Sequence, residues 1–184
     1  TREEDVFVSL ERRIAIAQEV GADVFLSLHA DSLAEGQAHG ATVHILAPEA
    51  SDIASTRLVE RHDRERVLAG LDLTNADDQV LGVLLDLARQ ETQPRTSALA
   101  RAAVVGMAQH GGPMYRRPLR TAGFSVLKAA DIPSALIEIG FISSPRDLKN
   151  LQNPDWRAQM AIGIRKGLAL WRDSDLARRA LVRQ

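Results

Sequence analysis

The stretch Val24-Phe25-Leu26-Ser27-Leu28-His29 indicates the fold class, because it is an apolar run of strand length that ends on an ionisable residue. A nearly continuous apolar run is typical of a strand buried on both faces of a parallel sheet. His29 stands at the carboxyl end of this run, and open α/β sheets bind their ligands outside the carboxyl ends of their strands. The stretch therefore predicts a buried strand that carries a candidate site residue.

The segments on either side alternate between helical and strand patterns. Apolar residues at three- and four-residue spacings predict an amphipathic helix over residues 3–20, which ends at Gly21. Strand-length apolar segments follow at residues 40–46, 124–127 and 134–139. Residues 52–109 are helical in pattern with expected breaks at residues 70–75 and Pro94, and a last long helix starts with Asn153 as its cap and Pro154 in its first turn.

Alternation of strands and helices predicts a three-layer α/β domain with a mostly parallel central sheet flanked by helices. At 184 residues the chain is long enough for one core, so we expect a single domain over residues 1–184. Residues 50–109 are expected to form a helical insertion in it. His44 falls in the middle of a predicted strand, where a surface or half-buried position is expected, while His39 and His110 are expected in loops beside glycines.

The composition excludes several classes of function and of site. With 23 basic and 24 acidic residues the chain has no net positive charge that would attract nucleic acid. We also identify no stretch in which basic residues cluster. No apolar run approaches the roughly 18 residues that a transmembrane segment needs. The chain contains no cysteine, which excludes disulfides and thiolate metal sites. Any metal ligands must therefore be His, Asp or Glu.

Glu138 lies inside the apolar segment Ala-Leu-Ile-Glu-Ile-Gly-Phe. An ionised and unpaired carboxylate in a buried strand costs several kcal/mol, so Glu138 is either paired, protonated or directed into a site. The alternatives are that Glu138 faces solvent from an edge strand and that His29 is a hydrogen-bonded core histidine. The pattern alone does not decide between these alternatives and a functional role.

Three ordered segments resemble signatures of the bacterial zinc-dependent N-acetylmuramoyl-L-alanine amidases. They are residues 22–31 (Ala-Asp-Val-Phe-Leu-Ser-Leu-His-Ala-Asp) with the preceding helix, residues 122–129 (Ala-Gly-Phe-Ser-Val-Leu-Lys-Ala) and residues 132–143 (Ile-Pro-Ser-Ala-Leu-Ile-Glu-Ile-Gly-Phe-Ile-Ser). By this resemblance His29 would be a zinc ligand and Glu138 the catalytic carboxylate. The resemblance implies metal-assisted hydrolysis of the amide between N-acetylmuramic acid and L-alanine of peptidoglycan, with Zn²⁺ as the cofactor.

The family completes its zinc site with a His and a Glu that precede the Thr-Arg pair with which this sequence begins. We therefore expect that the N-terminal part of the domain lies outside this chain. His29 would then be the only one of the three usual ligands present, and the chain alone is expected to hold zinc weakly. None of the other four histidines stands in chain order where those ligands are expected: His39, His44, His62 and His110.

The helical insertion resembles the regulatory segment of cell-division amidases, in which a helix covers the active site until an activator protein moves it. Residues 58–70 are similar to that helix, and His62 falls where an acidic blocking residue is expected. His62 shares a helical stripe with Ala54 and Leu58, so it could face inward. The alternative is a solvated charged helix that carries an incidental histidine.

The resemblance implies an exported enzyme of the periplasm or cell envelope that acts in wall remodelling and daughter-cell separation. An alternative function of another class is a catalytically incompetent protein with the same fold, which binds peptidoglycan or a division partner without cutting. A generic α/β domain that binds a small ligand would leave Glu138 unexplained.

Overall fold

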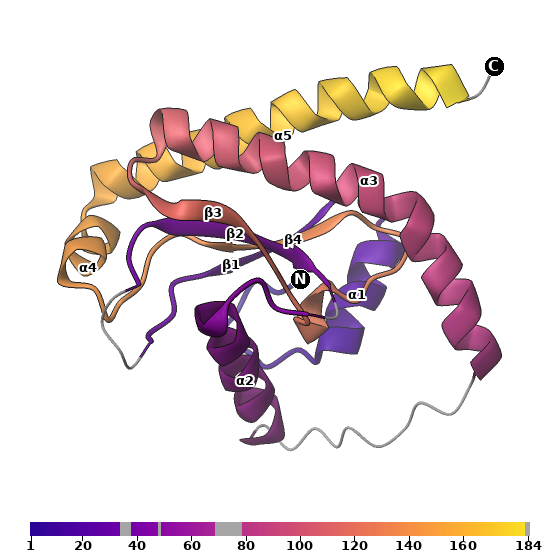
Figure 1. Cartoon of the computed structure of the whole chain (residues 1–184), viewed down its shortest axis with the longest axis horizontal. Helices are drawn as coiled ribbons and strands as arrows, with labels where there is room; N and C mark the ends of the chain where they lie inside the picture. The colour runs from indigo at the N-terminus through magenta and orange to yellow at the C-terminus, as the bar shows by residue number, and fades with distance from the viewer. Residues whose placement is uncertain (34–37, 48, 69–78, 183–184) are drawn as a thin grey trace.

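The computed structural model describes residues 1–33, 38–47, 49–68 and 79–182, and Figure 1 shows their helices packed on both faces of one sheet. The expected break at residues 70–75 lies outside the described residues. The elements follow in the order α1 (Leu10–Glu19), β1 (Phe25–His29), β2 (Ala41–Leu46), α2 (Ile53–Leu68), α3 (Gln79–His110), β3 (Met114–Ala122), η1 (Ser125–Leu127), β4 (Ser134–Glu138), α4 (Pro145–Gln152) and α5 (Pro154–Val182).

The sheet has the strand order β1-β4-β2-β3. The β1–β4 and β2–β3 pairs are parallel and the β2–β4 pair is antiparallel, so two of the three pairings are parallel and the sheet is mixed. Because β1 is an edge strand of the described sheet, Leu28 is 59% exposed. The prediction that this strand is buried on both faces is therefore wrong at Leu28, although Phe25 is buried as expected.

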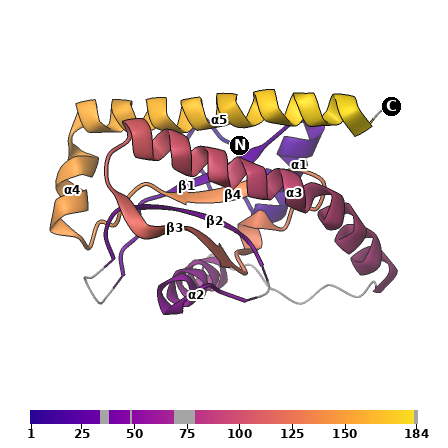
Figure 2. The ribbon, with the colours of Figure 1, turned by 45° about the horizontal axis from the view of Figure 1, so that its top comes forward.

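Helices α3 and α5 cover one face of the sheet, and α1 and α2 lie on the other (Figures 1 and 2). Each face has its own core, one between the sheet and the α3–α5 pair and one beneath α1 and α2. This arrangement confirms the three-layer α/β class. Glycines allow α3 and α5 to approach closely, since a Cβ on Gly106 would lie 2.3 Å from the carbonyl oxygen of Gly163.

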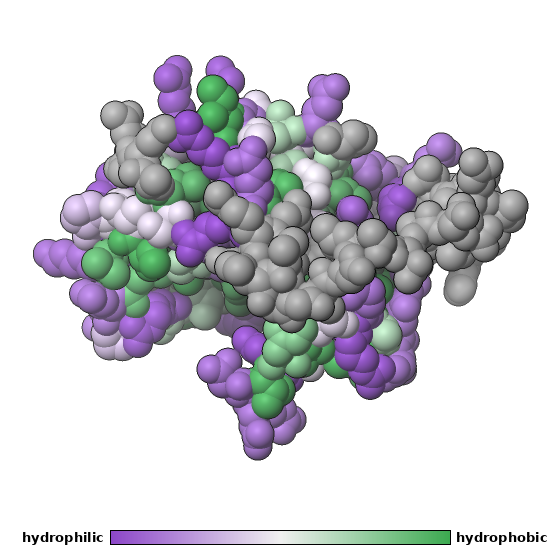
Figure 3. Space-filling view, turned by 90° about the horizontal axis from the view of Figure 1, so that it is seen from below, coloured by the Kyte–Doolittle hydropathy of each residue, from purple (hydrophilic) through white to green (hydrophobic). Residues whose placement is uncertain are grey.

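Surface hydropathy is mixed on the face that is turned toward the viewer from below. Figure 3 shows groups of apolar residues separated by hydrophilic ones on this face. Such an arrangement is normal for a protein surface, most of which is contributed by apolar atoms even when the core is buried. Within the described ranges, none of the helices has the length and apolar character needed to cross a membrane.

Helix α1 is shorter than predicted. It begins at Leu10 because the Ser9 side chain caps it by accepting a hydrogen bond from the Arg12 backbone N–H. Phe7, which lies within the predicted helix at residues 3–20, precedes this cap and is 59% exposed. The predicted end is confirmed, since the helix stops at Glu19 and Gly21 adopts a φ of 62°.

The strand expected at residues 124–127 is wrong, because Ser125–Leu127 form a 3₁₀ turn that buries Val126 and Leu127 beneath the sheet. The third strand is instead Met114–Ala122, which was not predicted. Its sequence Met-Tyr-Arg-Arg-Pro-Leu-Arg-Thr-Ala hides the strand, because charged residues and a proline interrupt the apolar pattern and a register shift separates its two paired ends.

The expected break at Pro94 is also wrong, because α3 continues through this residue. Proline removes one helical hydrogen bond and bends a helix without necessarily ending it. In Figure 1 α3 changes direction along its length. Its later part lies in the core, where Leu99, Ala103 and Met107 are at most 1% exposed. The predicted insertion at residues 50–109 therefore contains a helix that the core requires.

Candidate metal centre

Strand register brings the two predicted site residues together. Glu138, the last residue of β4, is the register partner of His29 at the end of β1 and of Thr42 in β2. Neighbouring residues in a sheet present their side chains on the same face. His29 and Glu138 therefore meet at one end of the β1–β4 pair.

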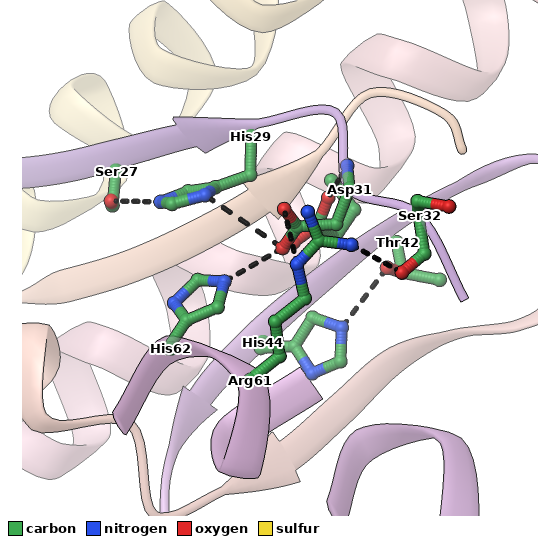
Figure 4. A network of polar contacts seen from close by, with 9 residues as sticks. Ser27, His29, Asp31, Ser32, Thr42, His44, Arg61 and His62 are labelled. Carbon is green, nitrogen blue, oxygen red and sulfur yellow. Dashed lines mark hydrogen bonds and ion pairs between the residues drawn. The ribbon is translucent and has the colours of Figure 1, made fainter. Parts of the chain in front are cut away.

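Four ionisable side chains converge at this end of the sheet, and Figure 4 labels His29, Asp31 and His62 among them. One donor atom from each of His29, Asp31, His62 and Glu138 lies within 4.8 Å of those of the others. His62 reaches the group from α2, which confirms that it faces inward. Asp31 was not predicted as a site residue, although it follows His29, the last residue of β1, by two residues, and that proximity was the available signal.

Hydrogen bonds hold the two histidines in their orientations. The Nε2 atom of His29 lies 2.9 Å from the Ser27 hydroxyl, which leaves Nδ1 at 3.9 Å from Oδ2 of Asp31. On the other side, His62 Nε2 lies 2.7 Å from the same Asp31 oxygen. The two imidazole rings are 4.5 Å apart between centroids. A ring nitrogen of each histidine therefore points toward the same carboxylate oxygen, Oδ2 of Asp31.

Asp31 is the central carboxylate of the group. Burial acts to raise the pKa of Asp31, but the hydrogen bond and charge of His62, with the charges of His29 and Arg61, outweigh burial and lower it. Arg61 also donates from Nη1 to the carbonyl oxygen of Ser32 at 2.5 Å. Adjacent residues of α2 thus bind both the side chain and the backbone of the loop after β1.

Glu138 is fully buried, with 0% exposure. Its Oε2 atom accepts a hydrogen bond from the Asp31 backbone N–H at 3.2 Å, whereas Oε1 has no hydrogen-bond partner among the described residues. Burial, followed by the charge of Asp31, raises the pKa of Glu138 well above its usual value. An orphaned buried oxygen beside imidazole and carboxylate donors fits a divalent metal such as zinc.

The other histidines lie outside this group. His44 is fully buried rather than half-buried, because it faces the core beneath α2 and packs edge-on against Phe124 at 5.2 Å. Its Nε2 atom lies 3.0 Å from the Thr42 hydroxyl. Burial and the nearby charge of Arg120 lower the pKa of His44 to about 3. His39 is in a loop as expected, whereas His110 is the last residue of α3.

Residues 1–169 match the protein family described as N-acetylmuramoyl-L-alanine amidase. The chain belongs to this family. Among its relatives, AmiA of Escherichia coli is 32% identical over 169 residues, which cover 91% of this chain and 58% of AmiA. AmiC of Neisseria meningitidis is 29% identical over 181 residues, which cover 97% of this chain and 43% of AmiC. The chain thus spans about half the length of these two amidases.

Solved amidase structures share the fold. Ami1 of Mycobacterium smegmatis superposes with a TM-score of 0.63 at 19% identity, over 94% of this chain and 65% of Ami1. An N-acetylmuramoyl-L-alanine amidase of Clostridium difficile 630 gives a TM-score of 0.62 at 21% identity, over 95% of this chain and 70% of its own. The mixed sheet with helices on both faces is therefore an amidase fold.

Proposed function

We propose that this chain forms the catalytic region of a zinc-dependent amidase that cleaves the bond between N-acetylmuramic acid and L-alanine in peptidoglycan. The observation that carries the proposal is the group of His29, Asp31, His62 and Glu138, whose donor atoms lie within 4.8 Å of one another at the end of β1 and β4. Family membership over residues 1–169 gives the reaction class.

His29 and Asp31 would hold zinc from the β1 end of the sheet, and His62 reaches the same point from α2. Zinc held there would supply a Lewis acid that polarises a carbonyl group and would lower the pKa of a bound water toward about 7. The Ser27 contact turns His29 Nδ1 toward Asp31, which places nitrogen and oxygen donors around one point. Imidazole and carboxylate are both ordinary zinc ligands.

Glu138 is the proposed general base. Its raised pKa suits a group that accepts a proton from water and then delivers it to the leaving amine near neutral pH. The Asp31 N–H fixes Oε2, so Oε1 is the oxygen left to receive the proton. In the overall reaction the water oxygen joins the lactyl carbonyl, the C–N bond breaks and the L-alanine nitrogen takes the proton. The stem peptide is then free of the glycan.

The position of α2 supports the proposal that the amidase is autoinhibited. Catalytic zinc sites keep one position open for water, and a further protein donor fills it. His62 is such a donor, and α2 is held over the site by its contacts with Asp31 and by the bond from Arg61 to Ser32. We infer that the docked helix is the closed state and that an activator protein displaces it.

An activator and a role in daughter-cell separation remain parts of the proposal. A related structure is the CwlD amidase of Clostridioides difficile in complex with the GerS lipoprotein, so one protein with this fold has a protein partner. The substrate would place the enzyme in the periplasm or cell envelope. No observation on the described surface favours a nucleic-acid partner.

Hydrolysis of dye-labelled sacculi by the complete gene product tests the proposed function. Release of stem peptides that carry a free L-alanine amino group supports the amidase. Binding to sacculi without release, with zinc present, supports instead the incompetent peptidoglycan-binding protein that the sequence left open. Mass spectrometry of the soluble fraction separates these outcomes, because only amide cleavage at the lactyl group gives that amino terminus.

A further inference from the structure

Asp147 in α4 lies outside the metal centre and is nevertheless buried, with 3% exposure. Its backbone N–H donates to the hydroxyl of Ser144, which caps α4. In a capping box the acidic side chain three residues later would return to the N–H of the cap residue. Here Asp147 Oδ2 instead accepts from two other backbone groups, the N–H of Gly40 at 2.8 Å and the N–H of Phe141 at 3.1 Å.

These two N–H groups belong to segments that border the site. Gly40 precedes β2, in which Thr42 is the register partner of Glu138. Phe141 follows Glu138 by three residues. A buried carboxylate that accepts two backbone hydrogen bonds holds its donors strongly, because each bond is charge-assisted. Within the described ranges Asp147 has no ion-pair partner, so the backbone N–H groups are what satisfy its charge.

The segment after β4 is bonded in turn to the loop after β1. Ile139 N–H donates to the His29 carbonyl at 3.0 Å, and Ile142 N–H donates to the Asp31 carbonyl at 2.9 Å. Asp31 N–H then donates to Glu138 Oε2 at 3.2 Å. A continuous set of hydrogen bonds therefore connects the Asp147 carboxylate with the backbone of Asp31 and with the buried carboxylate of Glu138.

We propose that Asp147 is a positioning residue for the reaction, which sets the loop after β1 through Phe141 and thereby fixes Glu138 by way of the Asp31 N–H. The proposal rests on the proposed function, because it assigns Asp147 a task in presenting the general base. Misplacement of a catalytic group by about 1 Å can cost roughly a hundredfold in rate. A residue that does not touch the substrate can therefore control turnover by holding Glu138 in place.

The test compares Asp147→Ala with Asp147→Asn in the complete gene product. Alanine removes both hydrogen bonds, and we expect kcat on sacculi to fall about tenfold to a hundredfold with little change in KM. Asparagine keeps an oxygen that can accept from both N–H groups, and it should restore most of the turnover. The matched control is Asn153→Ala, which removes the α5 cap bonds to Asp155 and Trp156 and touches neither loop.

A second measurement does not depend on activity. Hydrogen exchange of the Asp31 and Ile142 backbone N–H groups should be about tenfold faster in Asp147→Ala and unchanged in Asn153→Ala. If Asp147→Ala does not fold, Asp147→Ser replaces it, because a serine hydroxyl is too short to reach both donors. Unchanged protection at Asp31, or equal losses in the control, would overturn the proposal. A wild-type protein without amidase activity would instead refute the proposed function. Hydrogen exchange would still show whether Asp147 holds the backbone at Asp31 in place.

Discussion

His62 of α2 and Asp31 after β1 are joined by a contact of 2.7 Å between Nε2 and Oδ2. The two side chains retain only 14% and 12% exposure, so the contact is largely shielded from water. Any movement that carries α2 away from the sheet must break this contact and uncover the donors beneath it. If α2 autoinhibits the enzyme as proposed, the strength of the His62–Asp31 contact helps to set the balance between the closed and open states.

His62→Ala should raise the basal hydrolysis of the complete gene product. Loss of about 1 kcal/mol from the closed state corresponds to roughly a fivefold change in the closed-to-open ratio, because about 1.4 kcal/mol is worth tenfold. Dye release without activator measures the change. Glu60→Ala is the control, since Glu60 is an exposed residue of the same helix. An unchanged or lower rate in His62→Ala, with folding intact, would remove His62 from the blocking role.

We expect zinc binding by the 184-residue chain to depend on His29, Asp31 and His62. The sequence alone placed one donor in the chain and predicted weak binding, whereas the structure brings Asp31 and His62 beside His29. We now expect about one zinc per chain after dialysis, and at least about a tenfold loss of affinity in His29→Ala, because affinity follows the number of ligands. His110→Ala is the control. Equal affinity in His29→Ala would place the metal elsewhere.

His44 should make stability fall on acidification. The folded chain keeps His44 neutral down to a pKa of about 3, while the unfolded chain takes up the proton near 6.5. The unfolded state therefore binds more protons between these values, so this contribution is complete above pH 6.5 and is lost as pH falls toward 3. It amounts to at most about 1.4 kcal/mol per pH unit.

Urea unfolding of the metal-free chain across this window, compared with His44→Leu, measures the contribution of His44. The variant should show a flatter dependence of unfolding free energy on pH than the wild type. Identical slopes in the two proteins would mean that the folded state also protonates His44 near its ordinary pKa. The comparison isolates His44, because the carboxyl groups that titrate in the same range are common to both proteins.

Gly167→Ala should loosen the packing of α5 on α3. A Cβ at this position would lie 2.6 Å from the Ala102 carbonyl oxygen and 2.8 Å from the Ala103 Cα, both of which are backbone atoms. Overpacking of this kind costs about 1–3 kcal/mol, which thermal or urea unfolding would resolve. Ala158→Leu enlarges an exposed position of the same helix and should have little effect. Equal stability of Gly167→Ala and wild type would show that the helices can separate freely.

The sequence revealed those parts of the site that local pattern controls. His29 at the end of one apolar run and Glu138 inside another were singled out as ionisable residues in buried segments, and the resemblance to the amidases supplied their roles. Asp31 was missed, since its role depends on a contact with His62, which lies 31 residues further along the chain. The inward orientation of His62 could be suggested from its stripe, but its contact with Asp31 depends on how α2 packs against the sheet.

The fold shows the same division. Strands β1, β2 and β4 carry apolar runs and were predicted close to their observed bounds. Strand β3 was not, because it is an edge strand whose pairing is interrupted by a register shift, so it carries arginines and Pro118 in place of an apolar pattern. This strand forms because it pairs with β2, and the sequence of residues 114–122 alone does not reveal that pairing.

Glu138→Gln in the complete gene product tests the central claim most directly. Glutamine keeps the shape of the side chain and the acceptor for the Asp31 N–H, but it cannot take up a proton. The account predicts retained fold and zinc with a loss of about 10²- to 10⁴-fold in the release of stem peptides from labelled sacculi. Release within about a factor of two of the wild type would contradict it, because a general base contributes far more than that.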